Sequence, residues 1–260
     1  MGFDTISLQQ HDFHFTIELN RHAARNSLND KMLMELQKAI QSASMETECK
    51  AVVIKGNSEI FCAGMDLHEL STCCTSENTG GIKRWATNYM NLLYLMHTTP
   101  KIIIAKVDGN VLAGGVGLVA ASDLVIASSK AIFRLTEILW GLLPAMVAPF
   151  LTRRTTIQSA YAMALLSRSI DAKEAQSIRL VDEVHENSDV ALQQILNHFE
   201  HLSNTTLEEL KRYFFGMQRI TKKTCQHAVE KTVELLTRQE IQKKICAYAS
   251  SRQLPWNTDQ

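Results

Sequence analysis

Short runs of β-branched and other apolar residues alternate with amphipathic helical patterns through the first two thirds of the chain. This alternation is typical of α/β proteins, in which helices connect the strands of a largely parallel sheet. The strand-like runs are FTIEL (15–19), AVVIKG (51–56), KIIIAKV (101–107), SDLVIAS (122–128), AIFRL (131–135) and LVDEV (180–184), and helical patterns cover about 29–45, 81–97, 157–166 and 172–177. The sequence therefore predicts an α/β fold.

After residue 187 the pattern changes to helices alone. Apolar residues recur at helical spacing in DVALQQILNHFEHL, LEELKRYFFGMQ and CQHAVEKTVELLTRQEIQKKICAYA. We therefore predict a core over residues 1–187 and a helical C-terminal region over 188–260. Such a region can cover an active site, contact a neighbouring subunit or complete the core, and the pattern alone does not choose between these roles.

The composition narrows the possible partners and location of the protein. Lys and Arg (27) balance Asp and Glu (27), so overall charge does not favour nucleic acid or an anionic membrane. The longest apolar runs are shorter than the ~18 residues of a membrane span. The six cysteines lack metal-site spacing, and the first residues do not resemble a secretion signal, so we expect a cytoplasmic protein without a metal.

Two turns rich in small residues each follow a strand and precede a helical pattern. They are FCAGMDLHEL (61–70) and VDGNVLAGGVGLVAASD (107–123). Glycine permits positive φ and close approach of a ligand to the backbone, and the first N–H groups of a helix have no partner within the helix. Either turn alone is explained by tight strand-to-helix packing. Together they can direct two N–H groups at one developing oxyanion.

These two turns, about fifty residues apart, resemble those of the crotonase (enoyl-CoA hydratase/isomerase) superfamily. LNRHAARNSLND (19–30), FRLTEILWGLLP (133–144) and SRSIDAKEAQSIRLVDEV (167–184) resemble three further segments of that family, so the similarity spans about 15–250. Ile178 and Arg179 stand where a glycine is usual. The resemblance implies a crotonase-like ββα spiral core over 1–187 with a helical C-terminal region, and a homotrimer or a dimer of trimers.

The resemblance also implies where the site lies. It places an oxyanion hole on the backbone N–H groups of Met65 and Gly114. Asp66, Leu67 and His68 would lie along the pantetheine and adenine end of the substrate. His68 stands where hydratases often carry a lysine, which weakens the expectation of tight binding to free coenzyme A; a histidine on a helix surface is the alternative reading.

Hydratases of the superfamily use two glutamates, and this sequence has a glutamate at only one of the two positions. Gly117 replaces the first glutamate, whereas the second is present as Glu137. The apolar residues around Glu137 are expected to raise its pKa toward a general acid/base role, although a carboxylate at a helix N-terminus can also be purely structural. Hydration through two glutamates is therefore disfavoured, and Glu137 is the expected catalytic residue.

A narrower resemblance connects AGGVGLVAASDLVIA, TEILWGLLPAMVAPFLTRR and the ending SSRQLPWNTDQ with the crotonase-type dehydratases of polyketide β-branching. It implies a lyase that dehydrates 3-hydroxy-3-methylglutaryl-acyl carrier protein to 3-methylglutaconyl-acyl carrier protein. The alternatives are a single-glutamate enoyl-CoA isomerase, the decarboxylase of the same cassettes, and a non-catalytic interaction protein, which the intact positions of the site disfavour. No cofactor is expected beyond the phosphopantetheine arm of the carrier protein.

The charge of the substrate distinguishes the dehydratase from the isomerase, because a glutaryl substrate carries a free carboxylate and a fatty acyl chain does not. Lys83 and Arg84, near the start of a helix, are the cations expected to bind that carboxylate, although both also fit a solvated helix face. The acyl carrier protein is expected to dock on local positive charge, for which the candidates are Arg21, Arg25, Lys243 and Lys244.

Overall fold

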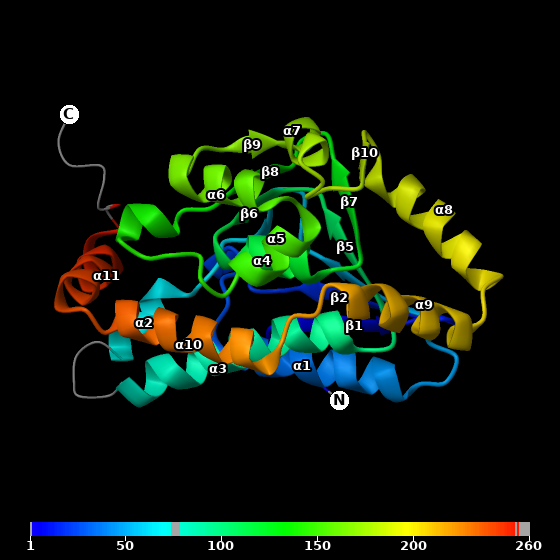
Figure 1. Cartoon of the computed structure of the whole chain (residues 1–260), viewed down its shortest axis with the longest axis horizontal. Helices are drawn as coiled ribbons and strands as arrows, with labels where there is room; N and C mark the ends of the chain where they lie inside the picture. Colours follow the sequence, from blue (N-terminus) through cyan, green and yellow to red (C-terminus); the bar gives the residue numbers. More distant parts are fainter. Residues whose placement is uncertain (1, 74–78, 253, 255–260) are drawn as a thin grey trace.

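The described strands are divided between two sheets, and from β3 to β8 successive strands alternate between them (Figure 1). The computed structural model describes residues 2–73, 79–252 and 254. The six-stranded sheet has the order β1-β2-β3-β5-β7-β10, and the four-stranded sheet has the order β4-β6-β8-β9. The strands are β1 (Ile6–Gln10), β2 (His14–Leu19), β3 (Ala51–Lys55), β4 (Ile60–Cys62), β5 (Ile102–Val107), β6 (Asn110–Leu112), β7 (Leu124–Ser128), β8 (Ile132–Arg134), β9 (Ile170–Asp171) and β10 (Glu183–His185).

Each repeat of the chain gives one strand to each sheet and then forms helices. β3 and β4 precede α2 and α3, β5 and β6 precede α4, and β7 and β8 precede η2, α5 and α6. This order is the ββα spiral that the resemblance implies. The helices are η1 (His22–Ala24), α1 (Asp30–Met45), α2 (Leu67–Cys73), α3 (Thr79–Thr98), α4 (Gly114–Ala121), η2 (Glu137–Trp140), α5 (Ala148–Arg154), α6 (Ile157–Leu166), α7 (Ala172–Ser177), α8 (Ser188–Glu200), α9 (Asn204–Met217), α10 (Lys222–Leu236) and α11 (Gln239–Ser251).

Strand direction follows from the connections. β1 and β2 are a short hairpin and therefore antiparallel, whereas the remaining pairs of the larger sheet are parallel because a crossover separates their strands. In the smaller sheet β4, β6 and β8 are parallel, and β9 adds an antiparallel edge. The carboxyl ends of β4, β6 and β8 therefore lie along one edge of that sheet.

The helical C-terminal region packs onto the sheets. α8 and α9 cover one face of the six-stranded sheet, where Phe199 and Leu207 contact the cluster that includes Val53 and Ile104. α10 runs along α3 and α11 contacts α2, as Figure 1 shows. Cys225 of α10 is buried in the same hydrophobic cluster as the central strands. The division into a core over 1–187 and a region over 188–260 stays a prediction, but their hydrophobic packing is continuous.

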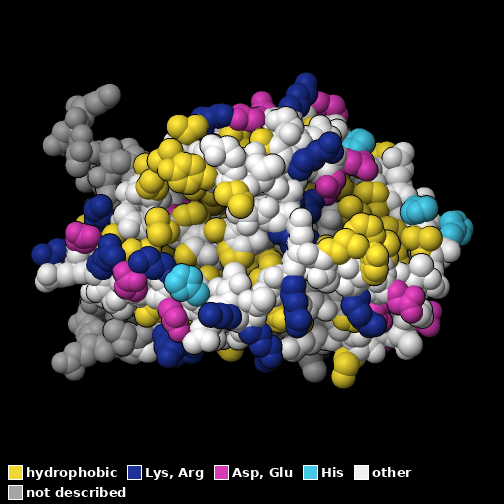
Figure 2. Space-filling view, viewed as in Figure 1, with side chains coloured by type: hydrophobic (Ala, Val, Ile, Leu, Met, Phe, Trp, Pro, Cys, Tyr) yellow, Lys and Arg dark blue, Asp and Glu magenta, His cyan; other side chains and the backbone are white. Residues whose placement is uncertain are grey.

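Two helices present apolar side chains to solvent. Hydrophobic side chains gather over α6 and over α9 in Figure 2, and the exposed residues there include Ile157, Tyr161 and Leu166 of α6 and Phe214 of α9. Burial of such faces is a common reason for subunit contacts. Within the described part of the chain, no helix combines the length and the apolarity that crossing a membrane requires.

Candidate active site

The ends of three neighbouring parallel strands supply the central positions of the site. β4 ends at Cys62 and is followed by Met65, β6 ends at Leu112 and is followed by Gly114, and β8 leads directly to Glu137. Because β4, β6 and β8 are adjacent and parallel, these three positions leave the same edge of the smaller sheet. The topology thus brings together residues that lie up to about seventy positions apart in the sequence.

Two residues with positive φ direct the first two strand ends. Gly64 has φ 84° and precedes Met65, and Ala113 has φ 46° and precedes Gly114. This region is open to glycine but strained for alanine, by about 1 kcal/mol or more. The two turns touch, because a Cβ added to Gly64 would lie 2.8 Å from the Ala113 Cβ and 3.0 Å from the Gly114 nitrogen. The turns therefore face each other, as the sequence predicts.

The backbone N–H groups of Met65 and Gly114 donate no hydrogen bond within the part of the chain that the structure describes. Leu28 lies beside Met65, but its N–H donates to Gly64 O (2.7 Å) and its carbonyl accepts from Asp66 N–H (3.1 Å). Leu28 thus bonds the residues on either side of Met65 and leaves the Met65 N–H without a partner among the described residues. Gly114 is the first residue of α4, where the helix dipole adds positive potential. Two such donors suit an oxyanion, and their assignment as the oxyanion hole stays a prediction.

Glu137 begins the 3-10 helix η2, which is separated from the end of β8 by Leu135 and Thr136. The residue is partly exposed, but its carboxylate oxygen Oε2 is buried and has no hydrogen-bond partner among the described residues. Desolvation raises the pKa of Glu137 to about 7, while hydrogen bonds from the N–H groups of Glu137 and Thr136 oppose the rise. A carboxyl group that is half ionised near neutral pH can both accept and return a proton. The rise has the direction expected from the apolar sequence around Glu137.

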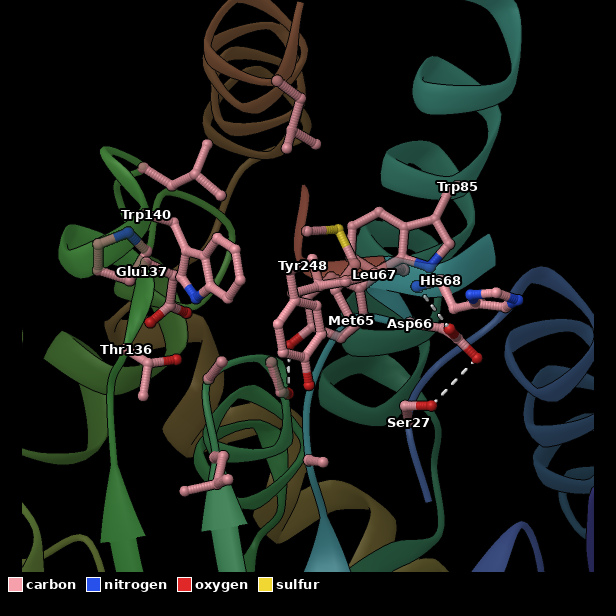
Figure 3. Close-up of a pocket in the computed structure, with 18 of the residues that line it drawn as sticks. Ser27, Met65, Asp66, Leu67, His68, Trp85, Thr136, Glu137, Trp140 and Tyr248 are labelled. Atoms are coloured by element: carbon pink, nitrogen blue, oxygen red, sulfur yellow. Dashed lines mark hydrogen bonds between the residues drawn. The ribbon is translucent and has the colours of Figure 1, made fainter. Parts of the chain in front are cut away.

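A cavity of about 520 Å³ connects the strand ends. This volume falls within the usual range of small-molecule sites. Its walls come from the segment 21–27, the turns after β4 and β6, residues 142–147, and parts of α3, α10 and α11. The Trp140 ring of η2 packs edge-on against Tyr248 of α11, with 5.3 Å between the centroids. Figure 3 shows the labelled side chains from these elements, with Thr136, Glu137 and Trp140 on one side, Asp66, His68 and Trp85 on the other, and Tyr248 and Met65 between them.

Asp66 lines this cavity but is held by the protein itself. Oδ2 accepts hydrogen bonds from Arg21 (2.9 Å) and Ser27 (3.1 Å), and Oδ1 accepts from the N–H groups of His68 and Glu69 (both 3.1 Å) at the start of α2. Burial would raise the pKa of Asp66, but the bonds from Glu69, Arg21 and Ser27 outweigh it, so the pKa is lowered. Asp66 therefore joins the segment 21–27 to α2.

The cavity brings together most of the residues predicted for the site. Its lining includes Met65, Asp66, Leu67, His68, Gly114 and Glu137. Gly117 is buried in α4 and does not line the cavity. Their individual roles in substrate binding stay predictions.

Lys83 and Arg84 are not brought to the cavity. Both side chains are exposed and neither belongs to the cavity lining, because α3 turns Trp85 and Tyr89 inward. Arg84 Nε lies 2.6 Å from the Asp30 carboxylate. Their contact with a distal carboxylate stays a prediction that the geometry does not favour. The cations that line the cavity are instead Arg21, Arg25, Arg134 and Arg252.

Several cavity residues were missed by sequence reasoning. Tyr248 comes from α11, Arg252 directly follows that helix, and Tyr89 comes from α3, where an aromatic side chain at helical spacing indicates core packing and not a site. Thr136 and Trp140 stand beside Glu137 in the motif FRLTEILWGLLP, so their proximity to it was the available signal. No cluster of three or more His, Cys, Asp or Glu side chains suited to a metal occurs within the described ranges.

The fold agrees with the comparison to known families. The family model for enoyl-CoA hydratase/isomerase matches residues 15–259, and the chain belongs to this family. It is an enzyme of the hydratase and dehydratase class, as the sequence predicts.

Particular relatives refine this picture. The chain is 31% identical over 242 residues to the bacillaene synthase dehydratase PksH of Bacillus subtilis, and this alignment covers 92% of each protein. The crystal structure of PksH superimposes with a TM-score of 0.88 at 28% identity, covering 98% of this chain and 100% of that one. The 2,3-dehydroadipyl-CoA hydratase of Escherichia coli is 34% identical over 183 residues, covering 69% of this chain and 68% of the hydratase.

Proposed function

We propose that this enzyme dehydrates 3-hydroxy-3-methylglutaryl-acyl carrier protein to 3-methylglutaconyl-acyl carrier protein in polyketide β-branching. The observation that carries the proposal is the buried carboxylate oxygen of Glu137, which has no hydrogen-bond partner among the described residues and shares a cavity with the similarly unpaired N–H groups of Met65 and Gly114. The similarity to the dehydratase PksH supports the reaction and the polyketide setting.

The chemistry needs one group that moves a proton and one site that holds a negative charge. Glu137 Oε2 removes the proton from the carbon next to the thioester, and the electron pair becomes an enolate whose oxygen accepts hydrogen bonds from Met65 and Gly114 N–H. The enolate then reforms the thioester carbonyl, the β-carbon to oxygen bond breaks, and the proton on Glu137 passes to the departing hydroxyl. The enoyl thioester and one water molecule result, and Glu137 is ionised again.

The pKa of about 7 suits this cycle, because the same group must accept a proton from carbon and return it to oxygen. A more acidic carboxyl group would be a weaker base, and a less acidic one would be protonated before the reaction. The dry environment that raises the pKa also strengthens the hydrogen bonds to the enolate. One carboxyl group therefore suffices in this proposal, although Gly117 stands where two-glutamate hydratases have their other glutamate.

The carrier protein presents the substrate on its phosphopantetheine arm, which enters the cavity past the segment 21–27 and α2. Arg25 and Arg252 are exposed at the cavity, and Lys243 is exposed on the adjoining α11. These charges suit the docking of an acidic carrier domain. We further propose that the enzyme acts in the cytoplasm as a homotrimer or a dimer of trimers.

Incubation with 3-hydroxy-3-methylglutaryl-carrier protein, followed by intact mass measurement, tests the proposed function. We expect loss of one water molecule and no loss of carbon dioxide. Loss of carbon dioxide from a methylglutaconyl substrate would identify the enzyme as the decarboxylase. Inactivity on both, with movement of a double bond in an enoyl-coenzyme A substrate, would identify it as an isomerase.

A further inference from the structure

Tyr89 lines the cavity, and its hydroxyl group lies beside Gly114, although the proposed reaction does not use it. Tyr89 belongs to α3, is 1% exposed and lines the cavity. Its hydroxyl donates a hydrogen bond to the Gly114 carbonyl (2.6 Å), on the residue whose N–H faces the oxyanion position. Because a phenol has one proton and two lone pairs, this bond leaves both lone pairs of the oxygen available.

The same hydroxyl fills the space beside Gly117. A Cβ added to Gly117 would lie 2.0 Å from the Tyr89 oxygen, which is far inside contact distance. The next atoms are the Tyr89 Cζ and Val147 Cγ2, both at 3.2 Å, so most of the conflict is with the hydroxyl. A side chain at position 117 and the hydroxyl of Tyr89 therefore exclude each other.

The hydroxyl is held rigidly by its neighbours. The Tyr89 ring stacks on Trp85, one helical turn earlier, with 5.5 Å between centroids and 20° between planes. The Trp85 indole N–H donates to the Leu28 carbonyl (2.9 Å), in the segment that pairs with Met65. α3 thus connects through two aromatic side chains to both turns that carry the unpaired N–H groups. A group fixed in this way is suited to orient a substrate.

We propose that the Tyr89 hydroxyl accepts a hydrogen bond from the β-hydroxyl of the substrate and orients that hydroxyl toward Glu137 for departure as water. The proposal rests on the proposed dehydration. No proton is transferred to or from Tyr89: Glu137 removes the α-proton and returns it to the leaving oxygen, and the phenol is unchanged. Burial, with smaller effects of Cys62 and Glu137, raises the pKa of Tyr89 well above its usual value, so the phenol stays protonated.

Two substrates separate orientation of the hydroxyl from formation of the enolate. With 3-hydroxy-3-methylglutaryl-carrier protein, water loss is measured; with the 3-methylglutaryl analogue, which has no hydroxyl, exchange of the α-proton in D₂O is measured. We expect Tyr89→Phe to slow water loss by roughly 10- to 100-fold, consistent with one lost hydrogen bond in a buried site, and to leave exchange within about threefold of wild type. Tyr94→Phe, which changes a tyrosine of α3 outside the cavity, should alter neither rate.

Equal losses in both assays would show that Tyr89 only supports Gly114, and unchanged rates would show that it has no role; either result overturns the proposal. If wild type exchanges the α-proton but never loses water, the proposed dehydration fails instead, so the two failures differ.

A double-mutant cycle provides a second test. Gly117→Ala should slow water loss about as much as Tyr89→Phe, because the added methyl group displaces the hydroxyl. When Gly117→Ala is added to Tyr89→Phe, the rate of water loss should fall by less than about threefold further, since the hydroxyl that the methyl group would displace is already absent. Fully additive losses would mean that the two positions do not compete for one space, which contradicts the proposal.

Discussion

The pKa of Glu137 makes a quantitative prediction about pH. With a pKa of about 7, the ionised fraction of this carboxyl group rises about tenfold between pH 6 and pH 8. A carboxyl group at its usual value of 4.5 would be almost fully ionised throughout that range. Because the base form removes the α-proton in the proposed mechanism, we expect kcat/KM for the carrier-linked substrate to rise about tenfold from pH 6 to pH 8.

Replacing Glu137 with glutamine tests the same group in two ways. The amide cannot accept the proton, so kcat should fall by roughly a hundred- to ten-thousand-fold, and the remaining activity should lose its dependence on pH. Stopped-flow quenching with mass detection gives both rates. Activity that is flat between pH 6 and pH 8 in the wild type, or near-normal turnover by Glu137→Gln, would refute the assignment.

The same shift has a consequence for folding. Because the folded-state pKa is above the unfolded value, the folded protein holds the proton between pH 4.5 and about 7, and stability falls as pH rises through that interval. The shift corresponds to at most about 3 kcal/mol, at about 1.4 kcal/mol per pKa unit. Glu137→Gln removes this effect, so urea denaturation should find the variant more stable than wild type at pH 8, by up to that amount, and by less at pH 5.

Arg134 and Arg252 line the cavity, so replacing either with alanine should raise KM for the glutaryl substrate roughly tenfold or more relative to KM for a neutral analogue. Lys83→Ala should not change this ratio. The reverse result would restore the prediction from sequence that Lys83 binds the distal carboxylate. The carrier-linked substrate should have a higher kcat/KM than its coenzyme A ester, with an advantage that decreases with added salt; equal values would contradict docking by charge. Gly64→Ala should lower kcat and the thermal midpoint together, because positive φ and a contact of 2.8 Å both oppose the methyl group. Light scattering should give the mass of three or six subunits, and Tyr161→Glu on the exposed face of α6 should reduce it if α6 forms the contact.

The central strands of the larger sheet were predictable because β2, β3 and β5 are five or six residues long and rich in apolar residues. FTIEL, AVVIKG and KIIIAKV correspond to β2, β3 and β5, each confirmed to within a residue or so of its ends. LVDEV only overlaps β10 (Glu183–His185), since Leu180 and Val181 are buried in a turn that follows α7. Helix α1 was equally clear, because Asn29 caps it by accepting a hydrogen bond from Met32 N–H (2.9 Å).

Most of the smaller sheet was not predictable from residue patterns, although AIFRL (131–135) correctly indicated β8. β4 and β6 have three residues each, which is too short for a period of two to be recognised, and only the family resemblance implied the spiral. The donor residues Met65 and Gly114 came from that resemblance together with the small-residue turns. The strain at Ala113 could not be foreseen, because alanine does not indicate positive φ.

The position of Lys83 and Arg84 illustrates a different limit. A run of sequence identifies a helix more reliably than the direction in which each side chain points, and here Trp85 and Tyr89 take the inward face of α3. Tyr89 itself was read as part of a helix and not as part of a site, because nothing in the sequence of α3 indicates that α4 approaches it.

The contribution of α11 to the cavity has a consequence for the newly synthesised protein. Tyr248 of this helix and Arg252, which directly follows it, line a cavity whose predicted catalytic positions all precede residue 138, and every strand among the described residues is complete by His185. On the ribosome, the sheets can therefore assemble while the cavity still lacks one wall. In the proposed mechanism, the nascent chain would have its base and its N–H donors in place before the cavity is enclosed. Thioester chemistry would then begin only after α11 has left the exit tunnel and docked.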